Sequence, residues 1–181
     1  MTTSTLRVAF VPGVEPDRFL RRWKALRNGT WLELIPVAQS RQIDALTAGE
    51  VDMCFARDTD PGNAFHAVSL WEERPVVVMS TDHVLSVLDE ITEADLAEET
   101  EIPSQGPDDA ADRVAVAATG VGYTRVPMSL ARLHHRKDAT HRPLLDADPT
   151  RIILLWPRDA DDELRQQFVG VVRGRTARSS R

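Results

Sequence analysis

The sequence is poor in cysteine and in long apolar runs, and both shortages exclude classes of protein. Its 181 residues include one cysteine, Cys54, which excludes an intramolecular disulfide and a zinc site built from several thiolates. The longest apolar stretches, residues 75–79 and 152–157, are too short to cross a bilayer. The opening MTTSTLRVAFVPG lacks the basic and apolar regions of a secretory signal. These absences predict a soluble cytoplasmic protein whose thiol stays reduced.

Lysine and arginine are scarce in the middle of the chain. The net charge is −6, but residues 58–112 hold fifteen acids and a single base, Arg74. The flanking segments carry an excess of bases, +2 over residues 1–57 and +6 over residues 113–181. Because duplex affinity depends on lysine and arginine neutralising phosphates, the acidic middle argues against direct, specific binding of DNA. The last residues, 176–181, are interpreted as a solvated basic tail.

Signatures of catalysis and of metal binding are also missing. The sequence contains no G-x-S-x-G, no G-x-x-x-x-G-K-[ST] and no H-E-x-x-H. Gly120-Val121-Gly122 follows a predicted helix, which is the wrong context for a dinucleotide-binding turn. Cys54 lies within a predicted strand with no cation beside it, so we expect an inert buried thiol. His134 and His135 point about 100° apart on a helix and do not share an ion easily. No metal, cofactor or catalytic residue is predicted.

The first third of the chain alternates apolar strands with amphipathic helices. The predicted elements are a strand at 6–11, a helix at 16–26, a strand at 31–37, a helix capped by Ser40 and ended by Gly49, and a strand at 51–56. Connections this short between strand and helix imply parallel strands beneath helices. Pro36 predicts that the second strand ends at an edge or a bend.

The rest of the chain continues with shorter elements. They are a strand at 70–80, a short helix at 93–98 capped by Thr92, a flexible connection at 99–107, a helix at 108–119, a strand at 121–126, a helix from Pro127 through Leu133, an extended piece at 142–145, a strand at 152–156 and a helix at 161–172. The whole pattern predicts an α/β protein.

A ligand crevice follows from this topology. Ligands of open α/β sheets bind beyond the carboxyl ends of parallel strands, where helix N-termini present backbone N–H groups. The segments so placed are 12–16, 38–40 and 56–58. Among them, Gln39 offers an amide, Ser40 a hydroxyl and Arg57 a guanidinium, which suit a small carboxylate-bearing molecule. Two structural alternatives stay open, in which Ser40 is only a helix cap and Arg57 only a surface charge.

Five stretches of the sequence occur in a defined order. They are LRVAFVPG, ALTAGEVDMCFAR, SLWEERPVVVMSTDHVL, ATGVGYTRVPMSLARL and RPLLDADPTRIILLWP. In order and spacing they resemble the effector-binding domain of LysR-type transcriptional regulators, over nearly all of residues 6–172. The resemblance implies a type 2 periplasmic-binding-protein-like fold of two α/β subdomains joined by a hinge. Subdomain I would comprise residues 6–80 and 143–175, and a shortened subdomain II residues 81–142.

The sequence departs from that family in three places. Only five residues precede Leu6, where a full-length regulator carries a winged helix-turn-helix, so we expect a stand-alone domain. The stretch between Leu96 and Val114 is shorter than in the family and lacks predicted strands. Val84 replaces the usual proline after Asp82-His83. The second departure concerns the ligand directly, because it removes part of the second subdomain.

The resemblance also implies an effector-binding site in the cleft between the subdomains. Carried over by position, its members come from the loops after the first two strands, from the end of the third strand and from the glycine-rich turn: Val14, Glu15, Gln39, Ser40, Arg57, Val121 and Gly122. Family members often have serine or threonine in the first loop. Val14-Glu15 therefore leaves open a cationic or hydroxyl-bearing ligand, or a vestigial pocket.

We predict a non-enzymatic protein that binds a small-molecule effector and influences transcription indirectly, through a DNA-binding partner. The family's pairing implies a homodimer in which the first helix, with Trp23 among Arg18, Arg21 and Arg22, contacts the acidic part of the partner. Two alternatives stay open. One is a protein–protein interaction module with a vestigial cleft. The other is a prephenate dehydratase-like enzyme, suggested by residues 123–126 (YTRV).

Overall fold

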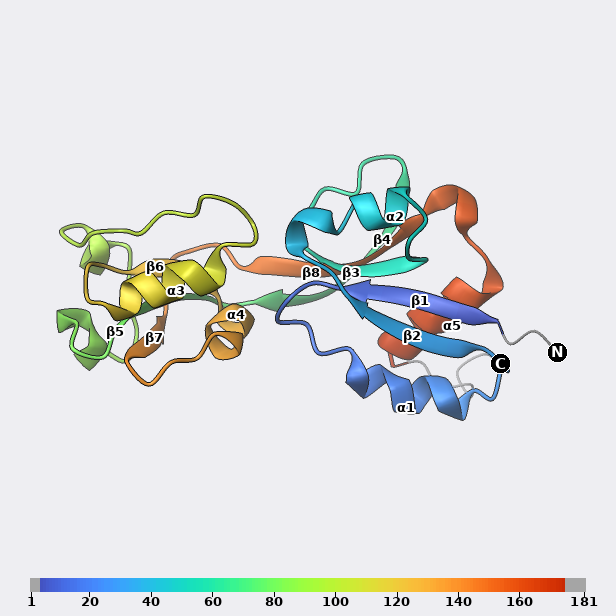
Figure 1. The fold of residues 1–181 in the computed structure, drawn as a ribbon, viewed down its shortest axis with the longest axis horizontal. Coiled ribbons are helices and arrows are strands. Elements are labelled where there is room, and N and C mark those ends of the chain that lie inside the picture. The colour runs from blue at the N-terminus through green and yellow to red at the C-terminus, as the bar shows by residue number, and fades with distance from the viewer. Residues whose placement is uncertain (1–3, 175–181) are drawn as a thin grey trace. The chain divides into compact units, whose positions relative to one another are not determined.

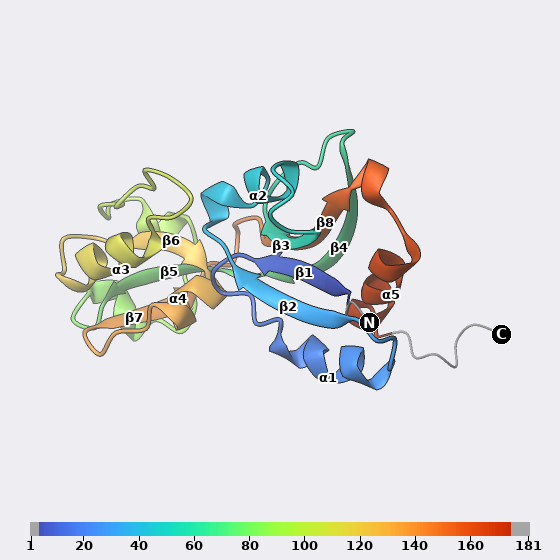
Figure 2. The same ribbon diagram turned by 45° about the vertical axis from the view of Figure 1, so that its right-hand side comes forward.

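The computed structural model describes residues 4–174, which divide into two compact units (Figures 1 and 2). Unit 1 contains the chain up to Trp71 and from Ile152 onward, and unit 2 is Glu72–Arg151. The sequence predicted subdomain boundaries after residues 80 and 142, which would place the strand at 75–80 in subdomain I. In the structure this strand belongs to unit 2. The predicted basic tail at 176–181 lies outside the described residues.

Unit 1 is an α/β sandwich around a five-stranded sheet. Its elements are β1 (Thr5–Phe10), α1 (Asp17–Ala25), β2 (Trp31–Pro36), α2 (Asp44–Thr47), β3 (Met53–Arg57), β4 (Phe65–Glu73), β8 (Thr150–Pro157) and α5 (Glu163–Val172). Within the described chain the strand order is β2-β1-β3-β8-β4. β1 pairs in parallel with β2 and β3, and β3 pairs antiparallel with β8. The predicted parallel start and the edge position of β2 are both confirmed.

Successive side chains of β1 point to opposite faces of the sheet, and both faces are covered by helices. Leu6 and Val8 belong to the core beneath α1 and α5, whereas Ala9 belongs to the core beneath α2 (Figure 1). Aromatic rings fill the first of these layers: Phe55 stacks on Phe19 at 5.5 Å between centroids and meets Phe168 edge-on at 6.0 Å.

Trp23 belongs to this core as well, which corrects its expected place on a pairing surface. Its side chain is 2% exposed, and its indole N–H donates to Thr30 O at 3.0 Å. A fully buried indole usually requires such a partner. The arginines of α1 are exposed on its surface, and Trp31 on the edge strand β2 is an exposed tryptophan of this region.

Unit 2 is built on a three-stranded antiparallel sheet. Its elements are β5 (Pro75–Ser80), α3 (Ala110–Ala118), β6 (Thr124–Pro127), α4 (Met128–Leu133) and β7 (Ala139–Pro143), with 3-10 turns at Val84–Val87 and Ala94–Leu96. The strand order is β6-β5-β7. Val76 and Val78 face α3 and α4, and Val77 and Met79 face the opposite layer.

Three local predictions were wrong because the chain bends or forms a short turn where the pattern looked continuous. The single strand expected at 70–80 is interrupted at Arg74, which separates β4 from β5. Ser40 does not cap a helix: it lies inside a 3-10 turn, Gln39–Arg41, and the residue before α2 is Ile43, which makes no side-chain cap. The intervening turn moves the start of α2 four residues beyond Ser40. The short helix after Thr92 is likewise only a 3-10 turn.

The stretch 99–107 is not the flexible connection that its composition predicted. Tyr123 N donates to Thr100 O at 2.9 Å and Ile102 N donates to Tyr123 O at 2.7 Å, which forms a short parallel bridge. The hydroxyl of Ser104 is bonded to the Asp109 carboxylate at the start of α3. Between Leu96 and α3 the described structure contains only this isolated bridge. No full strand forms there, as the sequence predicted. Within residues 4–174 no helix is both long and apolar enough to cross a membrane.

Candidate functional site

The carboxyl ends of the three parallel strands of unit 1 lie together. Val37 N, just after β2, donates to Phe10 O on β1 at 3.0 Å, and Val11 N donates to Phe55 O on β3 at 3.2 Å. The loops that follow therefore leave the sheet side by side. This is the edge at which ligands of open α/β sheets bind.

Arg57 is the charged residue at this edge. It ends β3, its side chain is only 2% exposed, and its Nη1 donates to the Gln39 side-chain oxygen at 3.2 Å. The Gln42 side-chain amide forms two hydrogen bonds with the Arg57 backbone. Arg57 N donates to Gln42 Oε1 at 2.9 Å, and Gln42 Nε2 donates to Arg57 O at 3.0 Å. The alternative of a surface charge is excluded by this burial.

The Arg57 guanidinium is the buried charged group of this cluster. Burial of a charge is costly without polar partners, and the side-chain oxygen of Gln39 is one partner of the guanidinium, whereas Gln42 binds the Arg57 backbone. The chain turns sharply immediately afterwards, because Asp58 adopts a left-handed backbone with φ 46°. The cluster thus fixes a planar cation at the strand ends.

The first loop contributes less than predicted. Gly13 adopts φ 88°, which allows a tight turn in which Val14 N donates to Val11 O at 3.2 Å. The Val14 side chain is buried in the core of unit 1, while Glu15 is exposed. Ser40, from the second loop, is exposed. Of the five predicted residues in unit 1, the structure joins Gln39 and Arg57 by a hydrogen bond.

Val121 and Gly122, the other two predicted residues, belong to unit 2. The side chain of Val121 is 60% exposed. Gly122 lies so close to the bridge at Thr100 that a Cβ atom built on it would be 2.2 Å from Thr100 O. This close approach explains why glycine stands here.

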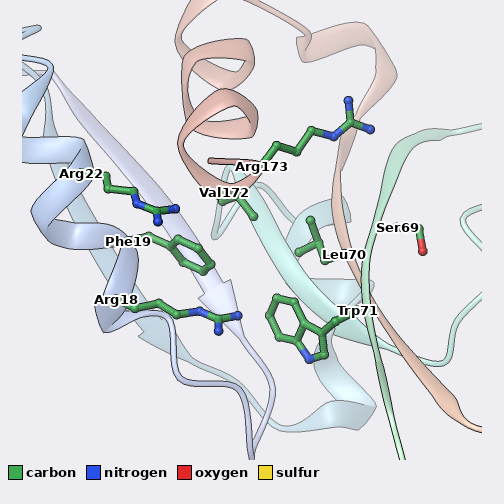
Figure 3. Close-up of a pocket in the computed structure, with 8 residues that line it drawn as sticks. All are labelled: Arg18, Phe19, Arg22, Ser69, Leu70, Trp71, Val172 and Arg173. Carbon is green, nitrogen blue, oxygen red and sulfur yellow. The ribbon is translucent and has the colours of Figure 1, made fainter. Parts of the chain in front are cut away.

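Sequence reasoning missed two features of unit 1. One is Gln42, which holds the backbone of Arg57 and gave no signal because a lone glutamine on a helix-like segment is unremarkable. The other is a pocket of about 420 Å³ against α1, α5 and β4 (Figure 3). It is lined by Arg18, Phe19, Arg22, Ser69, Leu70, Trp71, Val172 and Arg173. These residues come from three distant parts of the chain, so no local motif could indicate it.

The groups considered for redox or metal chemistry are in unfavourable surroundings. Cys54 is fully buried, as predicted, and burial raises the pKa of its thiol to about 12. Burial lowers the pKa of His134 and of His141. Across residues 4–174, no three His, Cys, Asp or Glu side chains are placed to hold one metal ion.

The residues behind the enzyme alternative are engaged in packing. Tyr123 and Thr124 are 3% and 0% exposed. The Thr124 hydroxyl donates to Ile102 O at 3.0 Å and accepts from Arg113. Arg125 forms ion pairs with Glu93 and Glu101. These contacts assign the segment a structural role.

Comparison with known proteins identifies the class. A family model for the LysR substrate binding domain matches residues 2–112, more than half of the sequence. The chain belongs to this family. A curated relative, the HTH-type transcriptional regulator CatR of Pseudomonas putida, is 28% identical over 184 residues. That match covers 86% of this chain and 63% of CatR, so the chain spans less than two thirds of the relative's length.

Solved structures share the fold at low sequence identity. The BenM effector-binding domain with its effector benzoate superposes with a TM-score of 0.77 at 19% identity, over 99% of this chain and 95% of that one. Full-length CbnR complexed with target DNA gives 0.74 at 17% identity, over 96% and 71%. The oxidized form of OxyR gives 0.73 at 19% identity, over 96% of each chain.

These matches confirm the predicted type 2 periplasmic-binding-protein-like α/β fold. Effector-binding domains of this family are non-enzymatic, which removes the prephenate dehydratase alternative.

Proposed function

We propose that this chain binds a small organic carboxylate at the carboxyl ends of β1, β2 and β3. The observation that carries the proposal is the buried guanidinium of Arg57, oriented by Gln39 and anchored through its backbone by Gln42. A guanidinium presents planar, paired N–H groups that match a carboxylate, and a fixed one binds without losing side-chain entropy. The structural neighbour BenM was solved with benzoate, a carboxylate effector.

The proposed ligand acts as an effector of transcription in the cytoplasm. Its effect on DNA would pass through a DNA-binding protein, because the acidic stretch 58–112 does not suit direct contact with phosphates. Val121 and Gly122 remain proposed effector contacts, together with Val14, Glu15 and Ser40. Val14 and Gly122 contribute backbone groups only, since one side chain is buried and the other absent, and the Val14 N–H already donates to Val11 O.

Thermal shift and calorimetry against a panel of mono- and dicarboxylates test this proposal. A ligand at one hundred times its Kd raises the unfolding free energy by about 2.7 kcal/mol. Two variants, Arg57→Gln and Gln39→Ala, should lose binding, the first by about tenfold or more. Arg41→Gln is the matched control, because Arg41 is an exposed arginine nearby that pairs with Glu50.

Circular dichroism of each variant separates loss of binding from loss of fold. Unchanged binding in a folded Arg57→Gln variant would contradict the proposal. An absence of any ligand in the panel, with partner proteins bound instead, would favour the interaction module.

We also propose that two copies of the chain pair through the α1–β2 face of unit 1. Trp31 on the edge strand β2 is 59% exposed, and the Lys24 ammonium lies 5.9 Å from its ring centroid. A groove of about 320 Å³ beside it is lined partly by Leu20 and Leu34. An exposed tryptophan on an edge strand next to apolar side chains is typical of a pairing surface.

A further inference from the structure

The pocket between α1, α5 and β4 combines positive charge with aromatic surface. Its apolar surface comes from Phe19, Leu70, Trp71 and Val172, and three arginines also line it (Figure 3). Its volume of about 420 Å³ is within the range of small-molecule sites, about 300–1,000 Å³. None of its lining residues belongs to the strand-end site around Arg57.

The charge of this pocket is unbalanced. Arg18, Arg22 and Arg173 are among its eight lining residues, and none of the eight is acidic. Across residues 4–174 none of these three arginines forms an ion pair with a carboxylate. Arg18 and Arg22 lie one turn apart on α1 and repel each other, so a bound anion would relieve this repulsion. The positive charge of this pocket contrasts with the net charge of the whole chain, which is −6.

Arg18 is held in position by two rings. Its guanidinium carbon lies 4.6 Å from the Trp71 ring centroid and 4.8 Å from that of Phe19. Stacking on ring faces orients the guanidinium while its edge N–H groups stay available to an acceptor. Figure 3 shows Arg18 and Arg22 extending from α1 toward the space beside Phe19 and Trp71, whereas Arg173 points away from it.

Arg22 is the second available donor. Its Nη1 makes one long hydrogen bond, 3.4 Å to Val171 O at the end of α5, and the rest of its guanidinium has capacity for a ligand. Two guanidinium groups on successive turns of one helix face, above an apolar floor, select a ligand that is anionic at one end and planar and apolar at the other.

We propose that this arginine pocket is a second ligand site of unit 1, separate from the strand-end site, and that it takes an aromatic carboxylate. The carboxylate accepts hydrogen bonds from Arg18 and Arg22. The ring packs against Phe19, Leu70 and Trp71. Because the pocket shares no residue with the strand-end site, one protein could hold two ligands at once, and each site can be disabled without touching the other.

Calorimetric titration with benzoate tests the proposal, with tryptophan fluorescence as a second readout because Trp71 lines the pocket. Benzamide lacks the charge and cyclohexanecarboxylate lacks the aromatic ring, so both should bind at least several-fold more weakly than benzoate. Arg18→Gln should weaken benzoate binding by about tenfold or more, as expected for loss of a charged hydrogen-bond donor. Arg21→Gln is the control, since Arg21 is an exposed arginine on the same helix that does not line the pocket.

Arg57→Gln separates the two sites. Binding of benzoate that survives Arg57→Gln and is lost in Arg18→Gln supports the second site. Binding lost in Arg57→Gln and retained in Arg18→Gln overturns it, while leaving the strand-end site in place. Absence of saturable binding to the wild-type protein, or equal binding of benzoate and benzamide, also overturns the proposal. Because Arg18 is exposed, its replacement is not expected to unfold the protein, and circular dichroism checks this.

Discussion

Gly122→Ala should destabilise unit 2, although alanine is usually tolerated at glycines with ordinary backbone angles. The added Cβ would be 2.2 Å from Thr100 O and 3.1 Å from Thr100 C, and the obstacle is backbone, which has no rotamer to change. The backbone at Thr100 must therefore move away from residue 122. That movement would weaken the hydrogen bonds from Tyr123 N to Thr100 O and from Ile102 N to Tyr123 O.

The size of this effect can be estimated from its parts. Overpacking of a tight contact costs about 1–3 kcal/mol, and loss of two backbone hydrogen bonds costs about 1 kcal/mol each. The lower entropy of an unfolded chain with alanine returns about 0.4–1 kcal/mol. We expect a net loss of about 2–4 kcal/mol in the free energy of unfolding.

Urea unfolding followed by far-UV circular dichroism measures this loss. Gly170→Ala is the matched control: Gly170 lies within α5, and no atom comes within 4 Å of a Cβ built there. That variant should gain about 0.5–1 kcal/mol, because glycine is a poor helix former. A Gly122→Ala variant within about 0.5 kcal/mol of the wild type would refute the close approach at Thr100.

Three further predictions concern other parts of the molecule. Asp52→Asn should destabilise unit 1 by about 1–3 kcal/mol at pH 7, because Asp52 accepts hydrogen bonds from Arg7 N, Nε and Nη2. Burial opposes ionisation of Asp52, but the hydrogen bonds and charge of Arg7, with the charge of Arg165, outweigh it and lower its pKa. A lowered carboxyl pKa adds stability above the unfolded value near 4, so in urea titrations the variant and wild type should converge as the pH falls below about 4. Cys54 should not react with a thiol reagent in the folded protein at pH 8, because its pKa is about 12, and should react in urea; rapid labelling of folded protein would contradict its burial. Trp31→Glu should weaken self-association in sedimentation at tens of micromolar, while Leu133→Glu, at a residue 54% exposed in unit 2 and outside the acidic stretch 58–112, leaves it unchanged; a monomeric wild type would overturn the pairing.

The sequence predicted β1, β3 and β8 of unit 1 well because most of their residues are buried. Val8, Ala9 and Phe10 are apolar in succession because both faces of β1 are covered, and a short apolar run before a turn is typical of such a strand. Helices α1 and α5 were visible from the spacing of Phe19, Trp23 and Phe168.

The errors have a common cause in contacts between distant residues. The stretch 99–107 looks unstructured by composition, but it is ordered by Tyr123, more than twenty residues later. Of the site, Gln39 and Arg57 were predictable from topology, since both follow parallel strands. The role of Gln42 and the pocket at Trp71 could not be predicted. The hydrogen bonds of Gln42 to the Arg57 backbone, and the packing of α1, α5 and β4 around the pocket, leave no local pattern in the sequence.

We propose that a small carboxylate binds beside Arg57, and a crystal structure of the protein with the tightest-binding ligand of the panel shows whether it does. We predict electron density for the carboxylate within hydrogen-bonding distance of the Arg57 or Gln39 side chain, at the carboxyl ends of β1, β2 and β3. A ligand bound only elsewhere in the molecule, with no density beside Arg57, would contradict the claim.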